Sequence, residues 1–291
     1  MYTTRKDKPL DPLNFAILAR VDLIAQQNNM AYFVIGATAR DLVMAHVFGI
    51  DAGRATRDVD LAIALEDWRQ FDAIKQSFID TGDFESGVQV HRLYYRPAAH
   101  GHAYPLDLIP FGPIERPGNE IAWPPDMQVV MNVAGYAEAL RAAIQVDIGN
   151  GVILRVVSIP ALAALKLLAW QDRGMLDNKD AYDFYFLLRN YTSAGNMDRI
   201  YEEMEILLEP NGFDLDLAGA ALLGNDVGRI LDQATRASIF ELLHDQVKRD
   251  RLTLHIGRRI DPTVVGLYLA QFERGMTMPL LPPSTPAAAS P

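Results

Sequence analysis

One segment, residues 32–65 (YFVIGATARDLVMAHVFGIDAGRATRDVDLAIAL), constrains the fold more than any other part of the sequence. Its pattern predicts a strand, a glycine turn, a helix, a loop and a second strand. Residues 32–35 are aromatic and β-branched, which is typical of a buried strand. This strand ends at three small residues that allow the backbone to approach another group closely, namely Gly36, Ala37 and Thr38.

Two acidic residues open the second strand of this segment. Asp58 and Asp60 are alternate residues of an extended chain, so both carboxylates are expected on one face of a sheet. Val59 and Leu61 then face the opposite way, toward apolar surroundings. Two neighbouring carboxylates repel each other unless a cation lies between them, and a divalent ion that prefers oxygen ligands meets this need. The pattern therefore indicates a metal site.

A third carboxylate lies in a later apolar run, residues 104–110 (YPLDLIP), which we predict to be a strand. Asp107 stands there between Leu106 and Leu108. An unpaired charge in such surroundings costs roughly several kcal/mol, so this side chain needs a partner.

The order of strand, small-residue turn, helix and Asp-x-Asp strand resembles the nucleotidyltransferase superfamily with the polymerase-β-like fold. The resemblance implies an α+β fold, in which a mixed sheet flanked by helices precedes a C-terminal helical region. It also implies that a nucleoside triphosphate binds at the turn, through Gly36, Ala37, Thr38 and Arg40. The sequence departs from the family pattern at Ala37, where a glycine or serine is usual, and a serine hydroxyl is therefore absent.

The same resemblance assigns chemistry to the three aspartates. Asp58 and Asp60 are expected to hold Mg²⁺, with two ions in the site, and Asp107 is expected to complete the set of catalytic and metal-binding residues. Its role would be to ligate the metal or to accept the proton of the attacking hydroxyl. The alternative for Asp107 is a structural aspartate that is bonded to a neighbouring amide.

From residue 159 onward the pattern becomes helical. We expect helices over residues 161–173, 179–191, 197–208, 226–249 and 262–274. Charged residues of the first two form a second candidate group, comprising Lys166, Arg173, Lys179, Asp180 and Asp183. A lysine in an apolar helix is rare unless its ammonium reaches a partner. An ion-pair network between the two helices explains the group, and so does binding of phosphates.

The order of these charged residues resembles the helical half of the AbiEii-like nucleotidyltransferases, the toxins of type IV toxin–antitoxin and abortive-infection systems. The resemblance extends over residues 31–191. It implies nucleotide-binding roles for Lys166 and Asp180 and a cognate antitoxin as a protein partner.

Composition limits the classes of function. With 291 residues, of which 49% are apolar, the chain can bury a large core. It has no cysteine, which excludes disulfides and thiolate metal sites and suits the cytoplasm. It has no long uncharged apolar run, so we expect no membrane association. A formal charge of -10 argues against an extended nucleic-acid surface, so contact with RNA would need a local basic patch.

These patterns predict three parts: a catalytic domain over residues 1–158, a helical domain over 159–278 and a disordered tail over 279–291. The predicted function is Mg²⁺-dependent transfer of a nucleoside monophosphate from an NTP to a hydroxyl acceptor, such as the 3′ end of a tRNA. One alternative is a small hydroxylated acceptor that resembles an aminoglycoside. Another is a non-catalytic protein that binds a nucleotide or a partner.

Overall fold

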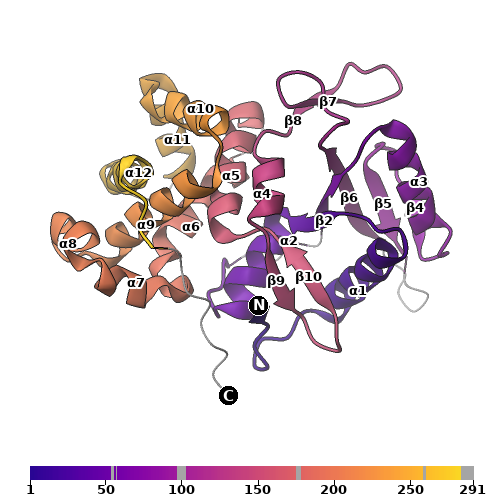
Figure 1. Cartoon of the computed structure of the whole chain (residues 1–291), viewed down its shortest axis with the longest axis horizontal. Coiled ribbons are helices and arrows are strands. Elements are labelled where there is room, and N and C mark those ends of the chain that lie inside the picture. Colours follow the sequence, from indigo (N-terminus) through magenta and orange to yellow (C-terminus); the bar gives the residue numbers. More distant parts are fainter. Residues whose placement is uncertain (54–55, 57, 97–102, 175–177, 258–259, 283–291) are drawn as a thin grey trace. The chain divides into compact units, whose positions relative to one another are not determined.

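The computed structural model describes the chain except residues 54–55, 57, 97–102, 175–177, 258–259 and 283–291. The chain divides into two compact units, Met1–Ser158 and Ile159–Pro291 (Figure 1). The first unit contains the glycine turn and the three aspartates, and the second contains the charged helices.

The first unit is built on a mixed sheet whose described strands follow the order β1-β9-β10-β2-β3-β6-β5-β4. Their bounds are β1 (Tyr2–Thr3), β2 (Tyr32–Ile35), β3 (Val59–Ala64), β4 (Phe84–Ser86), β5 (Arg92–Tyr95), β6 (Tyr104–Phe111), β9 (Ile144–Asp147) and β10 (Ile153–Val156). Strand β3 lies antiparallel to β2 and parallel to β6. All residues of β2 are buried, as its aromatic and β-branched sequence predicts.

Helices of the first unit accompany this sheet, as Figure 1 shows for α1 and α3. They are α1 (Pro12–Gln27), α2 (Gly36–Asp41), which continues as the π-helix η1 (Leu42–Val47), α3 (Trp68–Ile79) and α4 (Tyr136–Arg141). Apolar residues at helical spacing predict a helix over residues 66–80, and α3 forms within that range. Asp67 caps its first turn by accepting from the backbone N–H of Gln70.

The sequence VQVHRLYY predicts one strand over residues 88–95, and this prediction is wrong. Residues 88–95 do not form a single strand; residues 88–91 form a turn between β4 and β5, and Val88 is 99% exposed. The backbone N–H of Gly87 donates to the carbonyl of Arg92 and closes this hairpin. The proline-rich sequence of residues 110–125 predicts a loop, but this range contains β7 (Glu120–Ala122), which pairs with β8 (Val130–Asn132).

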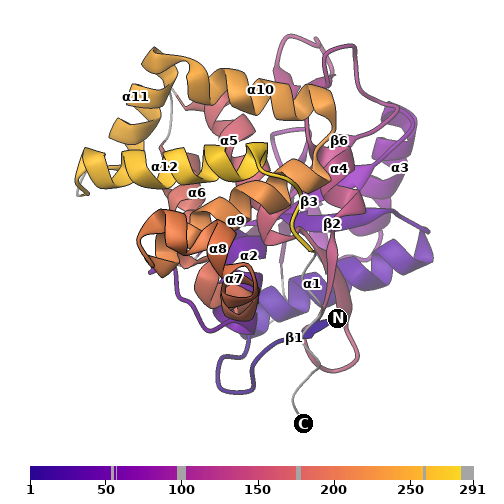
Figure 2. The same cartoon turned by 60° about the vertical axis from the view of Figure 1, so that its left-hand side comes forward.

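The second unit is helical in its described residues. Its helices are α5 (Ile159–Arg173), α6 (Lys179–Asn190), α7 (Met197–Glu202), α8 (Met204–Leu207), α9 (Leu215–Ile230), α10 (Gln233–His244), α11 (Gln246–Ile256) and α12 (Pro262–Thr277), with η2 (Thr192–Asn196) and η3 (Glu209–Asn211) between them. Helices α9 and α12 lie side by side (Figure 2). The apolar residues of α9 are buried along most of its length, so it is the central helix of this unit.

The prediction of one helix over residues 226–249 is wrong. The chain breaks twice within that range, after α9 and again between α10 and α11. Each new helix begins at an aspartate whose side chain accepts a backbone N–H, Asp232 for α10 and Asp245 for α11. Both are strong N-cap residues, and this signal marks the breaks better than the apolar periodicity does.

Residues 279–282, which their composition places in a disordered tail, are bound to α9. The backbone N–H of Leu281 donates to Oδ1 of Asn225 over 3.0 Å, and Nδ2 of Asn225 donates to the carbonyl of Pro279 over 3.0 Å. Leu281 is buried. The rest of the expected tail, residues 283–291, lies outside the described residues.

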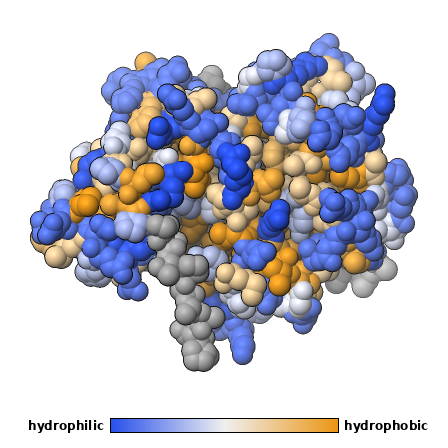
Figure 3. All heavy atoms as spheres, viewed as in Figure 1, coloured by the Kyte–Doolittle hydropathy of each residue, from blue (hydrophilic) through white to orange (hydrophobic). Residues whose placement is uncertain are grey.

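The face drawn in Figure 3 carries many hydrophilic side chains with apolar residues between them. Large apolar residues that are exposed occur in both units and include Val88, Val247 and Leu254. Among the described residues, no helix has the length and the apolar character needed to cross a lipid bilayer.

Candidate functional site

Three charged side chains form a row across neighbouring strands of the first unit. Asp60 of β3 is paired with Asp107 of β6, and Asp107 is paired with Arg92 of β5. Residues directly opposite each other on paired strands project from the same face of a sheet. Asp58 immediately precedes β3. The pKa of Arg92 is raised mainly by its hydrogen bonds to Asp107, and the charge of Asp58 raises it further. The structure therefore brings the three predicted aspartates to one region.

Gly36 stands at the end of this row because Ile35 is paired with Asp60. Its φ of 70° lies in the left-handed region, which residues with a Cβ rarely adopt. A Cβ added at this position would overlap with Oδ2 of Asp60. Glycine is thus required twice, once by the backbone conformation and once by the close approach of the carboxylate.

The predicted turn is the first turn of a helix. Helix α2 begins at Gly36, directly after β2, and Ile35 provides no side-chain cap. The first backbone N–H groups of a helix have no partner within the helix, and together with the helix dipole they form a site for anions. Thr38 does not direct its hydroxyl to this site, because Oγ1 donates to the backbone carbonyl of Asp58 over 2.6 Å. That bond joins the helix start to the Asp-x-Asp segment.

Arg40, which the resemblance places among the nucleotide-binding residues, is buried. Its side chain is 0% exposed, and its guanidinium donates to Oδ1 of Asp41 from Nε and Nη2, over 2.8 and 2.6 Å. In this position the guanidinium supplies positive charge beside the helix start, and its binding of the nucleotide stays a prediction. We therefore interpret Arg40 as a buried structural cation that fixes the beginning of α2.

The third carboxylate is bound by an arginine. Nε and Nη2 of Arg92 donate to Oδ1 and Oδ2 of Asp107 over 2.7 and 2.6 Å, the two-pronged geometry that makes Arg–carboxylate pairs strong. These two hydrogen bonds compensate the negative charge of Asp107, which is only 8% exposed.

Asp58 and Asp60 are the residues of this site that would hold a divalent ion. Asp58 and Asp60 provide carboxylate oxygens, the ligands that Mg²⁺ prefers, and the missing Cβ of Gly36 leaves room for the Asp60 carboxylate beside the helix start. Asp107 fits less well, because both of its oxygens accept from Arg92. Within the described parts of the chain, no three His, Cys, Asp or Glu side chains form a metal-binding group.

A cavity of about 380 Å³ lies next to the beginning of α2. Its polar lining includes Asp11, Asn14, Thr38, Asp41 and His46. Its volume lies within the usual range for small-molecule sites. Because Thr38 both lines this cavity and binds the backbone of Asp58, the cavity adjoins the carboxylate row.

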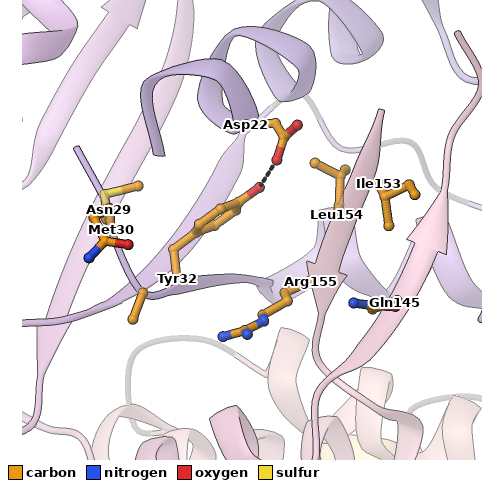
Figure 4. A pocket seen from close by; sticks show the side chains of 9 residues that line it. Asp22, Asn29, Met30, Tyr32, Gln145, Ile153, Leu154 and Arg155 are labelled. Atoms are coloured by element: carbon orange, nitrogen blue, oxygen red, sulfur yellow. Dashed lines mark hydrogen bonds between the residues drawn. The ribbon is translucent and has the colours of Figure 1, made fainter. Parts of the chain in front are cut away.

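A second cavity, of about 340 Å³, opens at the other end of β2 (Figure 4). There the hydroxyl of Tyr32 donates to Oδ1 of Asp22 over 3.2 Å, and Arg155 and Gln145 also line the cavity. Burial raises the pKa of both Tyr32 and Asp22. Tyr32 begins β2 and Gly36 follows its end, so roughly 13 Å of strand separates this cavity from the helix start. We assign it no part in the carboxylate site.

The charged residues of the second unit form a compact cluster. Nζ of Lys166 lies 2.8 Å from Oδ1 of Asp180 and 2.8 Å from Oδ2 of Asp183, and Nε of Arg173 lies 2.9 Å from Oδ2 of Asp180. The side chains of Lys166, Asp180 and Asp183 are 10%, 8% and 1% exposed. The cluster joins α5 to α6, as the ion-pair interpretation of the sequence predicts, and the predicted nucleotide-binding residues Lys166 and Asp180 contact each other directly. Lys179 is exposed on the first turn of α6.

Comparison with protein families identifies the chain. The family described as "Nucleotidyl transferase AbiEii toxin, Type IV TA system" matches residues 17–209. The chain belongs to this family. It is therefore an enzyme of the nucleotidyltransferase class, and the predicted fold class, a mixed sheet with flanking helices and a C-terminal helical region, is confirmed.

Other comparisons give only distant likenesses for this AbiEii nucleotidyltransferase. A search of curated proteins finds no match. An antigenic nucleotidyltransferase-like protein from Paracoccidioides brasiliensis is 15% identical, with 71% of this chain and 93% of that chain covered and a TM-score of 0.41. ANT(2")-Ia in complex with adenylyl-2"-tobramycin is 13% identical, with 72% and 97% covered and a TM-score of 0.36. The Thermotoga maritima CCA-adding enzyme complexed with tRNA_CCA is 11% identical, with 93% and 82% covered and a TM-score of 0.26.

Sequence reasoning did not select Arg92 of this AbiEii nucleotidyltransferase. The available signal was a cation at the start of an apolar run, RLYY, that precedes the strand of Asp107. Two antiparallel strands joined by a short connection place such residues opposite each other, and a buried aspartate needs a cation or a donor. The single strand predicted over residues 88–95 placed Arg92 in the middle of a strand instead of at its first residue, which obscured this pairing.

The close approach at Gly36 predicts a large loss of stability on substitution. Gly36→Ala is expected to lower the free energy of unfolding by about 1–2 kcal/mol for the left-handed backbone and by about 1–3 kcal/mol more for the overlap with Asp60. Gly53→Ala is a matched control, because Gly53 has a φ of 69° but no atom of the described residues lies within 4 Å of an added Cβ. Urea denaturation of both variants measures the difference. Equal losses would show that the carboxylate does not press on Gly36.

The cluster of the second unit predicts sensitivity to acid. Burial alone would raise the pKa of Asp180, but the charges of Lys166 and Arg173 outweigh it and lower that pKa. A carboxyl whose pKa is lower in the folded state stabilises the fold above its unfolded pKa of about 3.9, and this contribution is lost as the pH falls through the folded pKa. The free energy of unfolding should therefore fall below about pH 4 more steeply in the wild type than in Asp180→Asn. Asp172→Asn, at an exposed position of α5, should keep the wild-type slope in urea denaturation at pH 3–6.

Proposed function

We propose that this AbiEii nucleotidyltransferase transfers a nucleoside monophosphate from an NTP to a hydroxyl group, and that the carboxylate row of the first unit is its active site. The pairing of Asp60 with Asp107 beside the helix start at Gly36 carries this proposal. This pairing places a set of oxygen ligands beside an anion-binding helix start. A protein that only binds a nucleotide has no need of these oxygen ligands.

In the proposed reaction, the N–H groups of Gly36, Ala37 and Thr38 bind the triphosphate at the first turn of α2. The oxygen of the acceptor attacks the α-phosphorus, the bond to the β-phosphate oxygen breaks, and pyrophosphate leaves. A carboxylate of the row takes the proton of the acceptor hydroxyl, and Asp107 is the residue that we assign to this task. Asp58 and Asp60 would hold Mg²⁺, which neutralises charge on the phosphate oxygens.

The acceptor that we propose is the 3′ end of a tRNA, the acceptor implied by the resemblance to AbiEii-like toxins. Because the chain carries a formal charge of -10, its RNA contacts would be confined to a local region. A cationic small molecule that bears hydroxyl groups is the second candidate, favoured by the cavity beside Thr38 and its acidic residues Asp11 and Asp41.

Labelled nucleotides test the function and the acceptor together. The protein is incubated with Mg²⁺ and each NTP in turn, labelled at the α- or the γ-phosphate, and with total tRNA or a panel of aminoglycosides. We expect the α-label to enter an acceptor and the γ-label to leave as pyrophosphate. Transfer of the γ-label would show a kinase instead. No transfer of either label to either acceptor class would leave only the binding interpretation.

A further inference from the structure

Arg92 is held in place by its strand and by its neighbours. As the first residue of β5 it is paired with Asp107, so the two side chains leave the sheet on the same face. Its stem passes over Gly87, where an added Cβ would lie 3.0 Å from Cγ and 3.1 Å from Cβ of Arg92. The backbone of Gly87 donates to the carbonyl of Arg92 over 2.8 Å. These contacts within the hairpin fix the position of the guanidinium.

The charge of Arg92 acts on the carboxylate row. Both oxygens of Asp107 accept from the guanidinium, and the two side chains are 25% and 11% exposed, so water screens the pair only in part. A divalent ion on Asp107 would stand beside this positive charge and would share the same oxygens.

We propose that the Arg92 guanidinium takes the place of a second divalent ion, so that the site binds one ion through Asp58 and Asp60. This inference rests on the proposed function, and it replaces the two Mg²⁺ ions expected from the sequence by one ion and one fixed side-chain cation. Of the two roles implied for Asp107, it excludes that of metal ligand. The positive charge at Asp107 is then supplied by the protein itself and does not depend on the concentration of the metal.

Binding of Mn²⁺, followed through the electron paramagnetic resonance signal of the free ion, tests this role of Arg92. The wild-type protein should bind one ion, and Asp58→Ala should lose it. Arg92→Gln should bind a second ion, at least about tenfold tighter than any second ion in the wild type, because both oxygens of Asp107 become available. The double variant Arg92→Gln/Asp107→Asn should return to one ion.

Arg96→Gln is the matched control, since Arg96 follows β5 directly and pairs with Glu85 at an exposed position. It changes the net charge by the same amount and should leave Mn²⁺ binding as in the wild type. Two ions in the wild type would overturn the proposal whether or not Arg92→Gln folds. So would weaker binding by a folded Arg92→Gln, which would show that Arg92 orients Asp107 as a ligand.

The outcomes also separate this inference from the proposed function. One bound ion without any transfer of the α-label would count against the nucleotidyl transfer at this site and leave the role of Arg92 intact. Two bound ions with normal transfer would count against Arg92 alone. Absence of Mn²⁺ binding in the wild type would overturn the assignment of the ion to Asp58 and Asp60, and with it the role of Arg92.

Discussion

Asp58→Ala is expected to reduce nucleotidyl transfer at least about 10³-fold, which corresponds to about 4 kcal/mol of transition-state stabilisation. The substitution removes one of two carboxylates that would hold the ion, and with it the positive charge opposite the reacting phosphate. The rate is measured with α-labelled NTP and the acceptor that proves active. The fold should be kept, because Asp58 is exposed and Thr38 binds its backbone carbonyl instead of its side chain.

Glu66→Ala is the control for this experiment. Glu66 is an exposed carboxylate just beyond the other end of β3, so its removal changes the net charge equally without touching the row. We expect normal transfer and a change in unfolding free energy within about 0.5 kcal/mol. If Asp58→Ala transferred label as fast as Glu66→Ala, the assignment of the active site to this row would be wrong.

The central part of the row could be predicted from the sequence because it depends on short-range patterns. Asp58 and Asp60 are two residues apart at the start of an apolar strand, and Asp107 interrupts another apolar strand. The alternation of apolar residues does not show which strands are neighbours. The resemblance to a known fold predicted that these two strands are neighbours, and the pairing of Asp60 with Asp107 agrees with that prediction. The helix start at Gly36 was recognised as a close approach, although the residue that approaches, Asp60, is fixed only by the pairing of β2 with β3.

The properties that depend on side-chain surroundings could not be predicted. Arg40 was expected to add positive charge near the phosphates, but no spacing rule reveals that its guanidinium is enclosed and bound by the adjacent Asp41. Arg92 was not selected, because its importance comes from the strand opposite it and from a hairpin turn that was read as strand. In both cases the missing information is the three-dimensional neighbour of a long, flexible cation.

The second unit shows the same limit in another form. The sequence predicted that Lys166 needs a partner, and it offered both an ion pair and a phosphate. The structure shows the ion pairs, with Asp180 and Asp183 both 2.8 Å from the ammonium. A residue bound in this way has a structural task whether or not it also serves a nucleotide, and the two tasks predict different effects on stability.

Lys166→Met is expected to lower the free energy of unfolding by about 3–5 kcal/mol, the typical cost of removing one partner from a buried ion pair. Methionine fills a similar volume but leaves two carboxylates without the ammonium, in a place where they are 8% and 1% exposed. Urea denaturation measures the loss. Lys6→Met, at an exposed position of the first unit, should change stability by less than about 0.5 kcal/mol.

Double variants identify which carboxylate contributes more to the loss. The side chain of Asp183 is 1% exposed, whereas that of Asp180 is 8% exposed and also contacts the guanidinium of Arg173. Adding Asp183→Asn to Lys166→Met should therefore recover more stability than adding Asp180→Asn, because neutralising the more buried charge removes the larger desolvation cost. A Lys166→Met protein as stable as the wild type but unable to transfer label would reverse this interpretation and leave nucleotide binding as the task of Lys166.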